Sequence, residues 1–93
     1  MAESAINLSV CILTYNRDDL LADCLQSVLE QEFPPGKNEI LVVDNGSAPS
    51  ATLPLGLGSG AIRLVRLPEN VGNVAGMNYC LNHAQGDWVL FMA

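Results

Sequence analysis

Two short polar segments, each directly after an apolar run, carry residue types that suit ligand chemistry. Thr14-Tyr15-Asn16-Arg17 follows one run, and Asp44-Asn45-Gly46-Ser47 follows another. A carboxylate and amides in such places can pair with the edge of a nucleobase or with ribose hydroxyls. Taken singly, each segment is better explained by local structure, as a polar strand end with a helix cap and as an Asx turn. Their occurrence at two strand ends together favours a binding site.

Four short apolar stretches predict strands. They cover residues 8–14, 39–43, 62–67 and 88–92. In the third, Arg63 and Arg66 stand on opposite faces, which suits an edge strand. Helical or long connections between the stretches indicate parallel strands with right-handed crossovers. We therefore predict an α/β, Rossmann-like fold, a mainly parallel four-stranded sheet in the order 3-2-1-4 with one helix on each face. The polar segments then flank the point where the strand order reverses, where such sheets bind ligands.

Two amphipathic stretches predict the helices. The first begins at Asp18, with Asn16 or Asp18 as its cap, and ends before Pro34-Pro35-Gly36. The second covers residues 71–84, with Asn70 as its cap. Its apolar residues recur at helical spacing, at Val74, Met77, Leu81 and Ala84. The Pro- and Gly-rich segment 46–60 between the second and third strands predicts a crossover that is mostly loop.

Composition excludes several classes of protein. A net charge of -6 with four Lys and Arg excludes nucleic-acid binding, which needs clustered basic groups. The apolar runs are shorter than the about 20 residues of a membrane span, and Glu3 stands where a secretory signal would be basic. We therefore expect one cytoplasmic domain without a transmembrane segment. The three cysteines form no C-x-x-C pair, so no metal site is expected from them.

Four strings occur in a fixed order along the chain. They are Val-Cys-Ile-Leu-Thr-Tyr-Asn-Arg (10–17), Leu-x-x-Cys-Leu-x-Ser-Val-Leu-x-Gln (21–31), Glu-Ile-Leu-Val-Val-Asp-Asn-Gly-Ser (39–47) and Glu-Asn-Val-Gly-Asn-Val-Ala-Gly-Met-Asn (69–78). Together they resemble the N-terminal half of a family 2 glycosyltransferase with the GT-A fold. The Asp-Asn-Gly-Ser string with Asn-x-Gly-x-x-x-Gly-x-Asn downstream is most similar to the rhamnosyltransferase-like branch. The resemblance covers essentially the whole chain.

The resemblance implies a nucleotide-sugar site made from both polar segments and from the start of the second helix. Its residues are Thr14, Tyr15, Asn16, Arg17, Asp44, Asn45, Asn70, Gly72 and Asn78. It places Thr14, Tyr15 and Arg17 by the base and ribose, and Asp44 on the base edge. A uracil or thymine ring offers an N–H there, which an ionised carboxylate can accept. Structural roles compete with this interpretation in the downstream segment, where Asn70 also suits a helix cap and Gly72 close packing.

The resemblance also implies an activity, the transfer of a sugar from a UDP- or dTDP-sugar to an acceptor hydroxyl. In the family, an Asp-x-Asp motif after the fourth strand holds Mg²⁺ or Mn²⁺ on the diphosphate, and an Asp or Glu base activates the acceptor. The chain ends at Ala93 before either. We therefore expect no catalytic residue and no metal ligand within it, no activity from the chain alone, and self-association through the fourth strand.

Three alternatives stay open at this point. A sugar-1-phosphate nucleotidyltransferase would have a Gly-rich loop after the first strand, and residues 14–17 contain no Gly. A receiver or flavodoxin-like module would need paired acids at that strand end, and Asp18-Asp19 lies too far beyond it. The third alternative is an α/β nucleotide-binding or structural fragment without catalytic activity.

Overall fold

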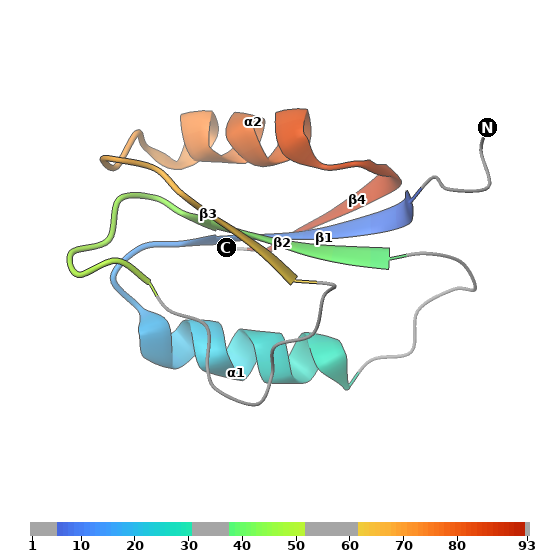
Figure 1. The fold of residues 1–93 in the computed structure, drawn as a ribbon, viewed down its shortest axis with the longest axis horizontal. Helices are drawn as coiled ribbons and strands as arrows, with labels where there is room; N and C mark the ends of the chain where they lie inside the picture. The colour runs from blue at the N-terminus through green and yellow to red at the C-terminus, as the bar shows by residue number, and fades with distance from the viewer. Residues whose placement is uncertain (1–5, 31–37, 52–61, 93) are drawn as a thin grey trace.

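The computed structural model of the chain describes residues 6–30, 38–51 and 62–92. It contains four strands and two helices among these residues (Figure 1). In order they are β1 (Ile6–Thr14), α1 (Asp18–Leu29), β2 (Asn38–Asp44), β3 (Ile62–Arg66), α2 (Asn73–His83) and β4 (Gly86–Met92). Each predicted strand and both predicted helices are present, with small shifts of their ends.

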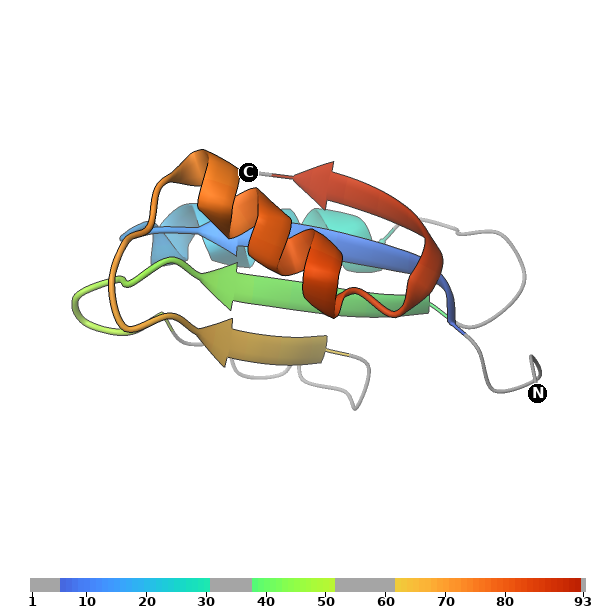
Figure 2. The ribbon, with the colours of Figure 1, turned by 90° about the horizontal axis from the view of Figure 1, so that it is seen from above.

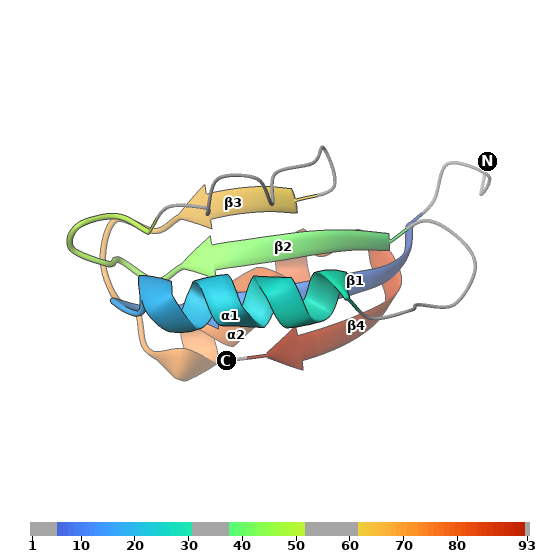
Figure 3. The same cartoon turned by 90° about the horizontal axis from the view of Figure 1, so that it is seen from below.

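The four strands form one sheet in the order β3-β2-β1-β4, and every neighbouring pair is parallel. Figure 2 shows the sheet from the side that α2 covers, and Figure 3 shows it from the side that α1 covers. The predicted strand order and the placement of the helices on opposite faces are therefore confirmed. The strand order reverses between β1 and β4, beside the strand ends that carry the two polar segments.

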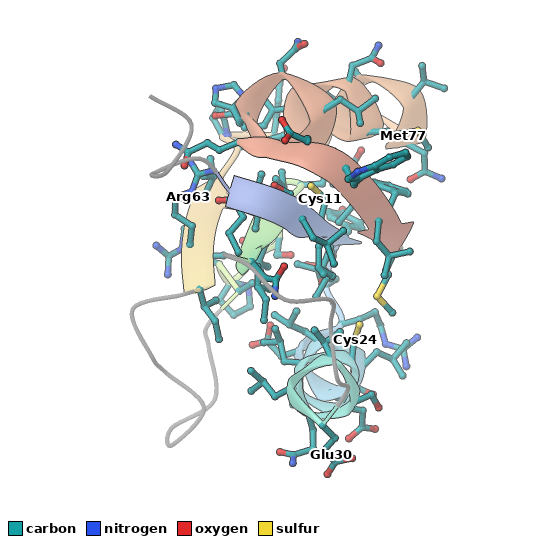
Figure 4. All side chains as sticks on the ribbon, turned by 90° about the vertical axis from the view of Figure 1, so that its right-hand side faces the viewer. Cys11, Cys24, Glu30, Arg63 and Met77 are labelled. Carbon is teal, nitrogen blue, oxygen red and sulfur yellow. The ribbon has the colours of Figure 1, made fainter. Side chains whose placement is uncertain are left out.

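Two apolar clusters, one on each face of the sheet, make up the core. Successive residues of β1 and β2 point to opposite faces, so Val10 and Ile12 join α1 while Cys11 and Leu13 join α2. This explains why residues 10–13 of β1 and 40–43 of β2 are all apolar, as expected for parallel strands covered on both sides. Figure 4 shows the same layering at α1, where Cys24 lies on the side toward the sheet and Glu30 on the far side.

The predicted cap of α1 was wrong. The residue at the cap position is Arg17, and its side chain makes no capping hydrogen bond. The Asn16 side chain instead accepts a hydrogen bond from the Ala48 N–H at 2.9 Å, and the backbone of Asn16 lies in the left-handed region with φ 54°. The helix ends at Leu29, and the segment 34–36 that was predicted to stop it lies outside the described residues.

The predicted start and cap of α2 were also wrong. Gly72 occupies the cap position with φ 88°, a conformation that suits glycine and prevents the helix from extending back to residue 71. Asn70 lies before the cap, and its Oδ1 accepts a hydrogen bond from the Gly72 N–H at 2.7 Å. Asn70 therefore shapes the turn that leads into the helix.

The apolar spacing that predicted α2 lies mainly on its exposed side. Val74, Met77 and Leu81 are exposed, whereas Gly76 and Cys80 are buried against the sheet. The neighbouring strand β4 is also open, with Trp88 at 75% exposed. Trp88 lies on the α1 face of β4 and the exposed Val89 on its α2 face, so this edge of the sheet is apolar on both faces. Among the described residues, neither helix has the length and apolar character needed to cross a bilayer.

Candidate functional site

The carboxyl ends of β1, β2 and β3 lie level with one another. Thr14 is paired with Asp44 across β1 and β2, and Asp44 with Arg66 across β2 and β3. The two segments remain hydrogen-bonded just past these strand ends, where the Asn45 N–H donates to the Thr14 carbonyl oxygen at 2.8 Å. The fold therefore brings the two polar segments to one edge of the sheet, as the sequence predicted.

Asp44 is buried, at 1% exposed, and its carboxylate organises the loop that follows β2. Oδ1 accepts from the Ser47 N–H at 2.9 Å, and Oδ2 accepts from the Ala51 N–H at 2.8 Å. Burial by itself raises the pKa of this carboxyl, but these hydrogen bonds and the nearby Arg66 guanidinium outweigh it and hold the pKa below its ordinary value. Asp44 is therefore a carboxylate at neutral pH.

Asn16 and Ser47 link the two polar segments. The Asn16 N–H donates to the Ser47 hydroxyl at 2.7 Å, and the Asn16 side chain accepts from the Ala48 N–H. A pocket of about 230 Å³ lies against this link, lined by Asn16, Asp18, Ala48 and Pro49. The turn after β1 and the loop after β2 thus form a single polar surface.

Asn45 connects the same surface to the segment before α2. It is 2% exposed. Its Oδ1 accepts from the Val71 N–H at 3.0 Å, and its Nδ2 donates to the Gly72 carbonyl oxygen at 3.3 Å. Gly46 supports this contact from the other side, because a Cβ on it would stand 2.4 Å from the Glu69 carbonyl carbon. Segment 69–72 is therefore fixed against the end of β2.

Tyr15 and Arg17 line a second pocket, of about 200 Å³, between the end of β1 and α1. The Tyr15 side chain is exposed, at 46%. The Arg17 guanidinium forms an exposed ion pair with Asp19, with Nη2 and Oδ2 3.1 Å apart. Arg17 is thus charged, close to the polar surface and held only by a solvent-exposed partner.

The predicted site residues therefore fall into groups. The structure places residues 14–17, 44, 45, 70 and 72 around the strand ends, by register and by hydrogen bonds. Asn78 lies on the exposed surface of α2, within the helix. Its predicted part in the site stays a prediction.

Sequence reasoning missed three residues that shape this surface. Ser47 bonds to Asn16, Gly46 permits the approach of segment 69–72, and Arg66 donates to the Ala51 carbonyl oxygen at 3.1 Å beside Asp44. The string Asp-Asn-Gly-Ser contained a signal for the first two, because Gly and Ser after Asp-Asn favour a tight turn. Arg66 gave no local signal, since its partners come from a different strand and loop.

The described part of the chain holds no group of three or more His, Cys, Asp or Glu side chains that could bind a metal ion. The residues at the strand ends therefore do not fit a divalent cation, and we derive no chemical step through one.

Comparisons with known proteins agree on one family. Residues 9–93 match the sequence profile described as glycosyl transferase family 2. The chain is 30% identical over 91 residues to the poly(ribitol-phosphate) beta-glucosyltransferase of Bacillus spizizenii, and 48% identical over 40 residues to glycosyltransferase AglE of Haloferax volcanii. A crystal structure of S. aureus TarS superposes with a TM-score of 0.71 at 25% identity.

These matches differ in how much of each protein they cover. The Bacillus and S. aureus matches each span 94% of this chain, and the Haloferax match spans 43%. The aligned part is 14% of the Bacillus enzyme, 13% of the Haloferax protein and 27% of the TarS chain. The likeness therefore concerns a small part of much longer proteins, and it agrees with the GT-A type of sheet predicted from the sequence.

Proposed function

Because the chain belongs to glycosyl transferase family 2, we propose that it forms the nucleotide-binding part of an enzyme that transfers a sugar from a nucleotide-sugar donor to an acceptor hydroxyl. One observation carries this proposal. A buried, ionised Asp44 lies level with Thr14 at the carboxyl edge of a parallel sheet, beside the point where the strand order reverses. Such an edge suits a nucleotide.

The proposed donor carries uracil or thymine. A carboxylate only accepts hydrogen bonds, and N3 of both rings carries a hydrogen that Asp44 can accept. Residues 14–17 are proposed to hold the base and ribose, with the exposed side chain of Tyr15 available for stacking. Asn45, Asn70, Gly72 and Asn78 belong to the proposed donor site on the side of α2.

Two observations point to different donor sugars. The strings 44–47 and 70–78 resemble the rhamnosyltransferase-like branch, whereas the Bacillus relative is named as a beta-glucosyltransferase of poly(ribitol-phosphate). We favour the rhamnosyl donor, with a glucosyl donor as the alternative. Competition between dTDP-rhamnose and UDP-glucose for the chain separates the two.

The remaining parts of the proposal concern the whole enzyme. Mg²⁺ or Mn²⁺ would neutralise the donor diphosphate when bound, and we place its ligands outside the described residues, which hold no cluster that could bind it. We accordingly propose that the 93-residue chain binds nucleotide but does not transfer sugar by itself. We also propose a cytoplasmic location.

We also propose that the chain self-associates through its exposed apolar residues. Trp88 and Leu90 are exposed on the α1 face of β4 and Val89 on its α2 face, and β4 is an edge strand of the sheet. Edge strands and large apolar patches recruit partners. Sedimentation at several concentrations tests this part, and a monomer at all of them would remove it.

The nucleotide proposal is tested by titrating UDP and CDP into the chain. The cytosine ring has no hydrogen on N3, so a base-edge contact through Asp44 predicts tighter binding of UDP by about tenfold, as a charge-assisted hydrogen bond of 1.5–3 kcal/mol allows. Asp44→Ala should bring UDP affinity down to that of CDP. Asp23→Ala, at an exposed site of α1, is the matched control and should keep the difference.

Two results would count against the proposal in different ways. Equal affinities of the wild-type chain for UDP and CDP would remove Asp44 from the base edge. No binding of either nucleotide to a chain that is folded by circular dichroism would overturn the proposed function itself.

A further inference from the structure

The side chain of Asn45 is placed between two segments that the sheet brings together. This side chain is buried, at 2% exposed. Its amide oxygen and nitrogen are both used by the backbone of segment 69–72, at the Val71 N–H and the Gly72 carbonyl oxygen. Its own N–H bonds to the end of β1. One residue therefore joins three parts of the candidate site.

The surroundings of Asn45 leave little freedom for this amide. A Cβ on Gly76 would stand 3.3 Å from Asn45 Nδ2 and 2.9 Å from the Leu13 methyl groups, so only glycine lets α2 approach here without displacing a neighbour. At Gly46, the residue that follows Asn45, a Cβ would stand 2.4 Å from the backbone of Glu69. Segment 69–72 is thus held by hydrogen bonds and by close packing on both sides of Asn45.

We propose that Asn45 is a positioning residue, which acts on the nucleotide by fixing segment 69–72 and not by touching the donor. This inference rests on the proposed function. The reasoning is that the Asn45 amide is buried with its oxygen and its nitrogen both directed at the backbone of segment 69–72, whereas that segment carries Asn70 and Gly72 at the surface. Loss of the amide would free two backbone groups that nothing nearby replaces.

The test compares three variants of the 93-residue chain by amide hydrogen exchange and by UDP titration. Asn45→Ala removes both side-chain hydrogen bonds. Asn45→Asp keeps an acceptor for the Val71 N–H but puts a second oxygen against the Gly72 carbonyl. Asn82→Ala, at an exposed position late in α2, is the matched control. Exchange of the Val42 amide in the centre of β2 reports on the stability of the whole fold.

We expect Asn45→Ala to speed exchange of the Val71 amide at least about tenfold more than that of Val42, and to weaken UDP binding by about tenfold. Asn45→Asp should fall between Asn45→Ala and wild type in both measurements, and Asn82→Ala should match wild type. Equal acceleration at Val71 and Val42 would show a merely structural role and overturn the inference. Normal UDP affinity of Asn45→Ala, with Val71 freed, would overturn it as well.

The exchange measurement needs no nucleotide, so it separates this inference from the proposed function. If Val71 exchange is unchanged by Asn45→Ala while UDP binds the wild type, the inference fails alone. If UDP does not bind the folded wild type, the proposed function fails, and the effect of Asn45 on affinity fails with it.

Discussion

The two ends of β2 each hold a buried carboxylate, and the two carboxylates have different kinds of partner. Glu39, near the amino end, is 6% exposed and is bound by three other parts of the fold. The Ser9 hydroxyl of β1 donates to it at 2.5 Å, and the Gln85 N–H before β4 donates at 2.7 Å. The guanidinium of Arg63 on β3 donates at 3.1 Å. Figure 4 looks at this end of the sheet and shows Arg63 on the edge strand.

Asp44, at the carboxyl end, is bound mainly by its own loop. Its hydrogen bonds come from Ser47 and Ala51, three and seven residues later. The carboxylate at the amino end therefore joins strands that are distant in sequence, whereas the one at the carboxyl end shapes a local surface with pockets beside it. A buried carboxylate alone does not indicate a site. Its place relative to the strand ends and the origin of its partners decide between a structural and a binding role.

The largest expected effect is at the structural end. Glu39→Ala removes the acceptor for Ser9, Gln85 and Arg63. It should lower the free energy of unfolding by about 3 kcal/mol, because removing a buried carboxylate leaves several donors without their hydrogen bonds. Urea unfolding monitored by circular dichroism measures it. UDP affinity of the folded fraction should stay close to wild type, because Glu39 is at the opposite edge from the proposed site.

Glu30→Ala is the control for this change. Glu30 lies at the exposed end of α1 and accepts a hydrogen bond only from the neighbouring Gln26 among the bonds described for it. Its loss should leave stability near wild type. Equal stability of the two variants would mean that the network around Glu39 contributes nothing, and the contrast between the two ends of β2 would be lost.

Lowering the pH is expected to have a smaller effect on the stability of the fold. For Glu39, burial by itself raises the pKa, but hydrogen bonds from Ser9, Gln85 and Arg63 outweigh it, so the pKa is lowered, as it is for Asp44. A carboxyl with a lower pKa in the folded state stabilises the fold above its unfolded pKa, and this contribution is lost as pH falls. Stability should therefore decline below about pH 4, by at most about 1.4 kcal/mol per pH unit for each group.

Unfolding in urea at a series of pH values between neutral and acid checks this prediction. The decline should be shallower in Glu39→Ala and in Asp44→Ala than in wild type, and unchanged in Glu30→Ala. A rise in stability on acidification would contradict the lowered pKa values.

Much of the fold was predictable from the sequence because its signals are local. The apolar runs of β1 and β2 and the polar segments after them identify a parallel sheet and its binding edge. The handedness of crossovers left few strand orders, and the predicted order 3-2-1-4 was one of them. The exposed apolar side of α2 was not predictable, since the spacing of Val74, Met77 and Leu81 is the same whether that side is buried or open.

The amino-end network was not predictable for a different reason. Ser9, Arg63 and Gln85 are 30, 24 and 46 residues from Glu39, and no local pattern joins them. A single Glu within a strand is usually explained as a residue at the surface. At the candidate site, Asp44 and Asn45 were found because they follow a strand directly, but their partners were set by loop geometry that composition does not encode.

The smallest expected effects come from a matched pair of serines, one at each end of the sheet. Ser9 is fully buried, donates to Glu39 and accepts from the Gly86 N–H at 2.8 Å, so Ser9→Ala should cost about 1–2 kcal/mol of stability and leave UDP affinity unchanged. Ser47→Ala removes the side-chain hydrogen bond to Asp44 and the partly exposed acceptor of the Asn16 N–H, and should change stability by less than Ser9→Ala, by about 0.5–1 kcal/mol. Because the bond to Asn16 holds the turn after β1 against the loop after β2, UDP affinity should fall by about threefold. Urea unfolding of both variants measures the change in stability, and UDP titration measures the change in affinity. If Ser9→Ala also weakened UDP binding, or Ser47→Ala destabilised the fold as much as Ser9→Ala, the division between a structural end and a binding end of the sheet would not hold.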